Sequence, residues 1–315
     1  MYILFDKKII TYYLIIKSRF MKRIFIVICL SIFFPLFCFS ENKINFSISQ
    51  NISLSFTQLD EILYISDGTE CSHLIWNQKP LLDFGLASSL EINNFSFAIG
   101  FDYSIPLGKS NMTDSDWIDG EKYSYTIHPI EKSKKINAFS SIKCNIKVVD
   151  FLSIGPIIEI DYIFNDIKAG NGTGKRNNRN IKVYGIDYTR HYFFFFTGLG
   201  FDFRLPRDIY VYSDFLLSPY CYQYSYNYHH GVNHPFSAEE KQKGNFSKYK
   251  ATILLGKKIN HTLSLELFSN YIFGTIDKGL FYTDYYSDNI SYISDQKSGS
   301  SIYSINIGIS TNFAI

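Results

Sequence analysis

The sequence lacks the features by which several large classes of protein are recognised. It has five cysteines in 315 residues, and two of them precede residue 40. The remaining three are too few and too scattered for a disulfide framework or a zinc site. Beyond residue 40, no stretch approaches the ~20 continuous apolar residues of a membrane-spanning helix. The charge balance, 31 basic against 29 acidic residues, does not suggest binding to nucleic acid. We therefore expect no metal, no organic cofactor, no nucleic-acid partner and no transmembrane helix.

The N-terminus reads as a leader. Met21 begins a short basic start, the apolar stretch 24–39 follows, and the small residue Ser40 ends it, which predicts a secretory signal peptide at 21–40. Residues 1–20 then form an upstream extension, either a spurious start or part of an unusual leader. The leader carries six of the 31 basic residues and one of the 29 acidic residues, so residues 41–315 have a net charge of about −3.

Aromatic residues are abundant where cysteine is scarce. They make up 18% of the sequence, and 25 of them are tyrosine. Rings with a polar tip concentrate at the two interfaces of a membrane. The composition therefore raises the possibility of a membrane protein that spans the bilayer without helices.

Hydrophobic alternation predicts β-strands along the chain. In 303–315, apolar residues and Thr311 occupy every odd position, and small or polar residues occupy every even one. This period of two indicates a strand, and the small polar face suggests a lumen. The same pattern recurs in other segments, which gives roughly ten strands: 44–56, 82–92, 95–107, 136–148, 152–164, 184–203, 208–229, 247–257 and 262–276.

The connections alternate between short polar turns and long polar segments. The long segments, which we expect to be loops, are 108–135, 165–180, 230–246 and 277–300. Short turns on one side and long loops on the other are typical of an outer-membrane barrel. We predict an all-β protein, a ten-stranded antiparallel transmembrane β-barrel, over a soluble β-sandwich of a secreted protein.

Two acids, Asp114 and Asp116, follow the strand 95–107. Their spacing of two on extended backbone places both carboxylates on one side. Neighbouring carboxylates raise each other's proton affinity and can hold or polarise a water molecule. Taken alone, the pair is also compatible with a solvated turn or part of a calcium site.

A tyrosine-rich strand carries a second set of polar residues. In 219–231, tyrosines occupy the even positions from 220 to 228. If these rings form the outward girdle, then Ser225, Asn227 and His229 face the lumen, and His230 shares the tyrosine face. A solvated loop histidine, or a partner of the girdle, is the alternative interpretation of His229.

These pieces resemble the omptins, a family of ten-stranded outer-membrane endopeptidases. The sequence NMTDSDW, with Asp114, Asp116 and Trp117, is similar to the family's Asp-x-Asp-Trp motif. Three aromatic segments match in the same order: HLIWNQ (73–78), EIDYIF (159–164) and YTRHYFFFFTGLGFDF (188–203). The resemblance extends from about residue 44 to the end.

The resemblance implies a catalytic site at the extracellular mouth. Asp114 and His229 would activate the attacking water, and Asp116 would support them. The family has an aspartate two residues before the histidine, and this chain has Asn227 there. Asparagine can orient an imidazole but cannot stabilise its charged form. A register in which His230 is the catalytic residue, with Tyr228 as its partner, would turn the pair outward.

Three residues in the sequence could supply the carboxylate that Asn227 lacks. They are Asp119, Glu239 and Glu240.

The resemblance also implies a substrate pocket. Omptins favour basic residues because acids line the pocket. Glu61 is similar in position to one of these acids, and the second would stand at Ser225, which is neutral. A one-acid pocket implies a weaker leaning to Arg or Lys.

Lipopolysaccharide is the lipid partner that the resemblance implies. The matching stretch has Glu159, and Asp161 stands where a basic residue is expected. His191, beside Arg190, stands at another matching position. We expect a weakened or absent lipopolysaccharide site.

The sequence thus predicts an outer-membrane barrel, which we expect to be monomeric. The resemblance to the omptins implies an active site on the extracellular side and aspartic-type endoproteolysis of peptides or surface proteins near basic residues. An inactive omptin-fold barrel, such as an adhesin or binding protein, and a small porin are the alternatives.

Overall fold

The computed structural model describes residues 44–315 except 232–235, 245–247 and 286–289. The signal peptide predicted at 21–40 and the extension at 1–20 lie outside these residues. The chain divides after Ile44, and the unit that follows contains the sheet. Within the described residues, no helix is long and apolar enough to cross a membrane.

The described residues form fifteen strands in one antiparallel sheet. Their bounds are β1 Ile44–Tyr64, β2 Glu70–Ile92, β3 Phe95–Pro106, β4 Ser110–Ile118, β5 Glu121–Cys144, β6 Ile146–Val149, β7 Leu152–Ala169, β8 Gly172–Arg176, β9 Arg179–Val183, β10 Ile186–Leu205, β11 Ile209–His229, β12 Phe236–Gly244, β13 Lys248–Lys258, β14 Leu263–Tyr285 and β15 Ile290–Ala314.

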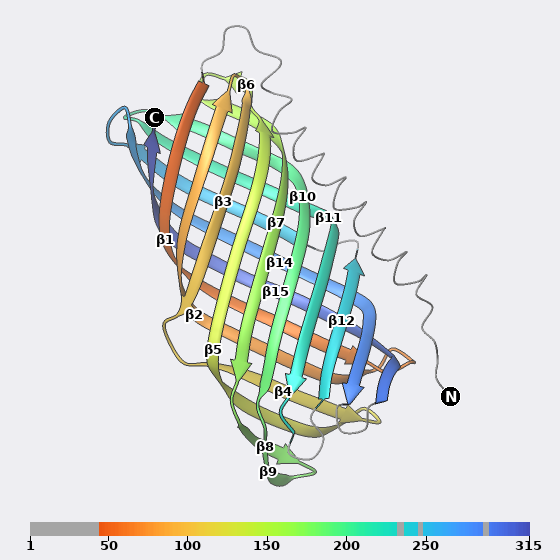
Figure 1. The fold of residues 1–315 in the computed structure, drawn as a ribbon. Helices are drawn as coiled ribbons and strands as arrows, with labels where there is room; N and C mark the ends of the chain where they lie inside the picture. The colour runs from red at the N-terminus through yellow and green to blue at the C-terminus, as the bar shows by residue number, and fades with distance from the viewer. Residues whose placement is uncertain (1–43, 232–235, 245–247, 286–289) are drawn as a thin grey trace. The chain divides into compact units, whose positions relative to one another are not determined.

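The sheet closes on itself as a ring of ten strand positions (Figure 1). β3 and β4 share one position between β2 and β5, and β12 and β13 share another between β11 and β14. The remaining positions are β1, β2, β5, β7, β10, β11, β14 and β15. β1 pairs with β15 from Ser47–Ala314 to Tyr64–Lys297, which closes the ring. The predicted ten-stranded antiparallel barrel is confirmed.

The outer wall carries the apolar face that the alternation predicts. On β15, Tyr303, Ile305, Ile307 and Ile309 are between 38% and 59% exposed. Their even-numbered neighbours turn inward, as Ser304 does at 6% exposure. A closed barrel leaves no unpaired edge, so an apolar outer belt of this kind can face lipid.

Polar side chains that bond to one another across the strands fill the lumen. Lys250 of β13 contacts Glu159 and Asp161 of β7, the latter at 2.9 Å. Lys135 of β5 donates to Thr57 of β1 at 3.2 Å. Such bonds satisfy buried polar groups that would otherwise be costly to remove from water. They occupy the space that an open pore would need.

The segments predicted as long loops are largely strands, so that part of the prediction is wrong. β4 and most of β5 occupy 108–135, and β12 lies within 230–246. The polar composition suggested loops. However, neighbouring strands pair through backbone hydrogen bonds, which form whether the side chains are polar or apolar. The wall therefore continues beyond the apolar belt, and β4, β8 and β9 gather at the end opposite the C-terminus (Figure 1).

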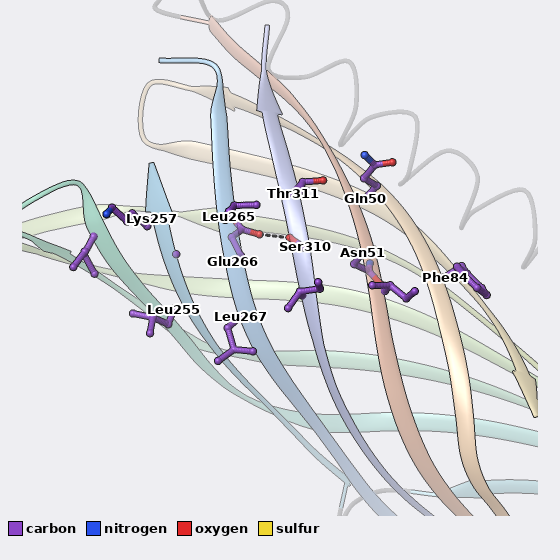
Figure 2. A pocket seen from close by; sticks show the side chains of 14 residues that line it. Gln50, Asn51, Phe84, Leu255, Lys257, Leu265, Glu266, Leu267, Ser310 and Thr311 are labelled. Carbon is purple, nitrogen blue, oxygen red and sulfur yellow. Dashed lines mark hydrogen bonds between the residues drawn. The ribbon is translucent and has the colours of Figure 1, made fainter. Parts of the chain in front are cut away.

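A hollow of about 740 Å³ lies near the other end of the barrel (Figure 2). Two of its lining residues, Ser310 of β15 and Glu266 of the neighbouring β14, are joined by a hydrogen bond in which the Ser310 hydroxyl donates. Its apolar lining belongs to the exposed outer row: Ile52, Phe84, Leu255, Leu265, Leu267 and Ile309. These side chains continue the apolar belt, so we do not take this hollow as the functional site.

Candidate functional site at the strand-extended mouth

Asp114 and Asp116 lie on β4, which is held on both edges. Asp116 is opposite Ser72 of β2 and Ser124 of β5, and the Ser124 hydroxyl donates to the Asp116 carboxylate at 2.5 Å. Asp114 is opposite Leu74 of β2. The pair therefore sits on a strand rather than in the predicted loop, and two-sided pairing fixes the direction of both carboxylates.

Asn227 and His229 lie on β11 with the facing that the alternation predicts. Ser225 and Asn227 are at most 1% exposed, whereas the tyrosines between them are half-buried on the other face. The His229 ring stacks on Phe236 of β12, with ring centroids 4.1 Å apart and planes 13° apart. The interpretation of His229 as a solvated loop histidine is therefore wrong.

One cavity of about 620 Å³ brings the two strands together. Asp114 and Asp116 line it from β4, and Asn227 and His229 line it from β11. More than a hundred residues separate the two pairs in the sequence. Its other polar lining residues are Glu61, Ser72, Cys71, His128, Arg176, Lys182, Tyr184 and His230.

Glu61 of β1 supplies the carboxylate beside Asn227. The Asn227 side-chain amide donates to Glu61 Oε1 at 2.8 Å, and Glu61 is 2% exposed. Of the three candidates from the sequence, Asp119 is exposed in a turn with φ of 52°, and Glu239 pairs with Lys241 at 3.2 Å. Neither is a partner of Asn227 in the structure.

Glu240 is the third candidate, and it lies in the same buried cluster. It stands opposite Ser225 in the β11–β12 register and is fully buried. Ser225, predicted as a pocket residue, is also fully buried. Glu240 thus places a carboxyl group beside Ser225, the neutral residue at which the resemblance led us to expect a second pocket acid.

Arg190 of β10 brings a cation to this cluster. Its guanidinium lies 4.0 Å from Glu61 Oε2 and donates to the Asp60 carbonyl at 2.8 Å and to the Tyr192 hydroxyl at 3.0 Å. It also lies over the Tyr188 ring at 4.8 Å, and Tyr188 stacks on Trp76 at 4.6 Å. Two buried carboxyls therefore face one guanidinium, a role for Arg190 that the sequence did not reveal.

The site residues lie beyond the apolar belt. The regular row of exposed apolar side chains ends at Phe56 on β1, at Leu107 before β4 and at Tyr220 on β11. Glu61, Asp114 and the β11 residues lie further toward the mouth. Their ionisation is therefore set by protein and water rather than by lipid.

Burial shifts the ionisation of three groups in the site. Burial first, and then the negative charges of Asp116 and Glu61, raises the pKa of Asp114 to about 8. Burial, with the nearby charges of His128 and His230, lowers the pKa of His229 to about 3. Burial and the charge of Glu61 raise the pKa of Glu240 well above its ordinary value. At neutral pH the His229 imidazole is neutral, so it can accept a proton.

His128 of β5 is a buried imidazole at the cavity that the sequence analysis missed. Its Nδ1 lies 2.9 Å from the Gly170 carbonyl, and its Nε2 lies 3.1 Å from the Thr126 hydroxyl. Burial lowers its pKa. The alternation of β5, in which His128 shares a face with Thr126 and Ser124, is the signal that could have identified it.

His230 follows β11 directly and lies on the same face as the tyrosines, as the sequence predicts. Its Nε2 lies 3.0 Å from Asp187 of β10, and its ring packs edge-on against Tyr228. Its side chain is 38% exposed. His230 also lines the cavity. Its polar partner is the Asp187 carboxylate, whereas the alternative register would make Tyr228 the partner.

The residues matched to a lipopolysaccharide site do not share one face. Glu159, Asp161 and Arg190 all point into the lumen, where each is at most 7% exposed. His191 points outward, with its Nδ1 2.8 Å from the Tyr162 hydroxyl. The matching of Glu159 and Asp161 to an outer lipid site is therefore wrong, because their parity on β7 turns them inward.

No group of three or more His, Cys, Asp or Glu side chains within the described part of the chain could hold a metal ion. Cys71, Cys144 and Cys221 form no disulfide bond among the described residues.

Comparison with known proteins gives a family for this barrel. Residues 42–314 match the omptin family. The outer membrane protease OmpT from Escherichia coli has a similar structure, with a TM-score of 0.75, 15% identity and coverage of 86% of this chain and 97% of that one. No curated protein sequence matches.

Two other solved barrels are much less similar. OprG from Pseudomonas aeruginosa gives a TM-score of 0.36 at 6% identity, covering 88% of this chain and 98% of that one. The P. putida toluene transporter TodX gives 0.31 at 10% identity, covering 86% and 90%. The family match spans nearly all of the barrel, and its closed wall and apolar belt are those of an outer-membrane protein. This chain belongs to the omptin family.

Proposed function

We propose that this barrel is an outer-membrane endopeptidase with its active site at the mouth beyond the apolar belt, facing the extracellular side. The observation that carries the proposal is the single cavity lined by Asp114 and Asp116 from β4 and by Asn227 and His229 from β11. The similarity to a protein described as an outer membrane protease supports it.

In the proposed mechanism, Asp114 and His229 activate a water molecule. The neutral imidazole takes a proton as the water oxygen attacks the scissile carbonyl carbon. The tetrahedral intermediate then collapses, the carbon–nitrogen bond breaks, and His229 returns the proton to the leaving amine. Asp114 in its ionised form stabilises the transient imidazolium, and Asp116, held by Ser124, supports Asp114. No covalent acyl intermediate and no cofactor are required.

Asn227 has a supporting role in this proposal. It cannot offer charge to the imidazolium, but its amide is fixed by Glu61 at 2.8 Å. The carboxylate that the asparagine lacks is therefore present one side chain away. We propose that this arrangement retains catalysis at a reduced rate.

Glu61 and Ser225 form the proposed substrate pocket, with a leaning toward Arg or Lys. Glu61 lines the cavity, and Glu240 lies behind Ser225. Because Arg190 already faces these two carboxyls, the excess negative charge is at most one unit. The preference for basic residues should therefore be weaker than a two-acid pocket without a cation would give.

The proposed partners follow from the location. They are peptide or surface-protein substrates, outer-membrane lipid, and lipopolysaccharide bound weakly, with the barrel as a monomer. Nucleic acid is not a proposed partner.

A barrel that binds without cleaving is the second candidate. The observation that favours it is the bond from Asn227 to Glu61, which directs the amide to β1. An adhesin or binding protein could retain the cavity after losing turnover.

Cleavage of a quenched fluorescent peptide with a central Arg-Arg separates the two candidates. The samples are the refolded barrel, Asp116→Asn and Asn227→Asp, each with and without lipopolysaccharide. Activity in the parent that is lost in Asp116→Asn supports the endopeptidase. A silent parent with an active Asn227→Asp variant supports the binding protein. Silence in all three, with folded barrels, would refute the catalytic assignment.

A further inference from the structure

The β8–β9 hairpin at the mouth is strongly basic. Its sequence GTGKRNNRNIKV (172–183) holds four cations and no acid. The cations are Lys175, Arg176, Arg179 and Lys182, and all four are exposed. Asn177 and Asn178 form the two-residue turn with φ of 48° and 61°, values that asparagine tolerates well. The hairpin therefore presents fixed positive charge on a defined backbone.

None of these four cations forms an ion pair with an acidic side chain of the described residues. Elsewhere on the barrel, exposed lysines do pair, as Lys132 does with Asp166 at 2.7 Å. Arg176 lies over the Tyr123 ring, 5.8 Å from its centroid. Its charge is thus available to a partner from outside the chain.

Pairing directs two of the cations to the catalytic side of the sheet. Asp116 of β4 is opposite Ser124 of β5, which is opposite Arg176 of β8, which is opposite Arg179 of β9. Residues directly opposite one another in antiparallel strands share a face. Arg176 and Arg179 therefore lie on the same face as Asp116, whereas Lys175, one residue away, lies on the other.

Arg176 is also part of the cavity itself. It lines the cavity with Asp114 and Asp116, as Lys182 of the same hairpin does, and its positive charge acts on Asp114. The site thus has acids at its centre and cations at one edge. A bound peptide that crosses the acids must pass along the hairpin on one side.

We propose that Arg176 and Arg179 form a subsite for acidic side chains of the substrate. This inference rests on the proposed endopeptidase function and extends it. Neighbouring strands lie about 4.8 Å apart, so Arg176 is roughly 10 Å and Arg179 roughly 14 Å from β4. An extended peptide advances about 3.3 Å per residue. The preferred acidic residues therefore lie about three to five positions from the scissile bond, on one side of it.

Three peptides with the same central Arg-Arg test the subsite. One carries glutamates three to five positions before the cleaved bond, one carries them after it, and one has glutamines at all of these positions. The measured quantity is kcat/KM for each acidic peptide divided by that for the neutral peptide. Two exposed charge pairs should favour one acidic peptide about fivefold in the parent.

Arg176→Gln and Lys175→Gln are the matched variants, because each removes one charge from β8 but from opposite faces. The preference should fall to about twofold in Arg176→Gln and to none in Arg176→Gln/Arg179→Gln, and it should persist in Lys175→Gln. An equal loss in Lys175→Gln would overturn the subsite, since bulk charge would then be the cause.

Failure of this inference is distinguishable from failure of the proposed function. A parent that cleaves the neutral peptide but prefers neither acidic one refutes the subsite alone. If no peptide is cleaved, the affinities of fluorescently labelled forms of the same peptides decide. About fivefold tighter binding of one acidic peptide, lost in Arg176→Gln and kept in Lys175→Gln, supports the subsite, and equal affinities overturn it.

Discussion

Replacing Asn227 by aspartate perturbs the balance of charge beneath the cavity. The Asn227 amide donates to Glu61 at 2.8 Å, and both side chains are at most 2% exposed. Aspartate has no N–H, so an ionised Asp at this position would face Glu61 and Glu240 without a donor. The Arg190 guanidinium already lies 4.0 Å from Glu61, and its positive charge also acts on Glu240. The variant can restore a donor only by binding a proton.

That proton sets the size of the effect. An aspartate has an ordinary pKa near 4, and each pH unit by which it must stay protonated above that value costs about 1.4 kcal/mol. The expected loss of stability is about 4 kcal/mol at pH 7 and about 1.5 kcal/mol at pH 5. The sign follows from a raised pKa in the folded state, because stability is then lost as pH rises from the unfolded pKa toward the folded one.

Urea unfolding in detergent micelles, followed by the fluorescence of Trp76 and Trp117, measures this loss. The double variant Glu61→Gln/Asn227→Asp is the control, since it exchanges the amide and the carboxylate and restores the hydrogen bond. We expect the double variant to lie within about 1 kcal/mol of the parent, given the usual range for one retained bond. An Asn227→Asp variant as stable as the parent at pH 7, or equally destabilised at both pH values, would refute the reasoning.

Three further predictions concern pH, the lumen and the two histidines. The kcat/KM of the parent should rise with pH to a plateau above about 8, because Asp114 must ionise while His229, with a pKa of about 3, stays neutral; a flat profile from pH 5 to 9 would contradict the assigned roles. Lys250→Met should lower the free energy of unfolding by about 3–5 kcal/mol, because it leaves two buried carboxylates without their cation, and an unchanged urea midpoint would argue against that pairing. His229→Gln should reduce peptide cleavage by about 100-fold or more, the usual effect of losing a general base. His230→Gln should reduce it less than tenfold, and the reverse order would move the catalytic role to the Asp187-paired imidazole.

The alternation of side chains was enough to predict the wall of the barrel. Period two along β15 and β11 gave the facing of the β15 isoleucines, Asn227 and His229, because a closed barrel separates its two faces strictly. The same rule could have shown that Glu159 and Asp161 point into the lumen and not toward lipid, since they alternate with the exposed Ile158 and Ile160.

Other features depend on contacts that the sequence order does not encode. The bond between Asn227 and Glu61 joins residues 166 apart, and it depends on where β1 and β11 meet across the lumen. The extension of β4 and β5 was missed because polar composition resembles that of loops, although backbone pairing holds these strands. The inward direction of Arg190 was visible from parity, but its place between two carboxyls was not.

The most direct test of the central claim is mass spectrometry of the Arg-Arg peptide after incubation in ¹⁸O-labelled water with the parent barrel and with Asp116→Asn. We expect one cut, a single ¹⁸O atom in the new carboxyl group, and a rate about 100-fold lower in the variant. An intact peptide, or cleavage at the same rate by a folded Asp116→Asn barrel, would contradict the claim that this cavity is a water-activating peptidase site.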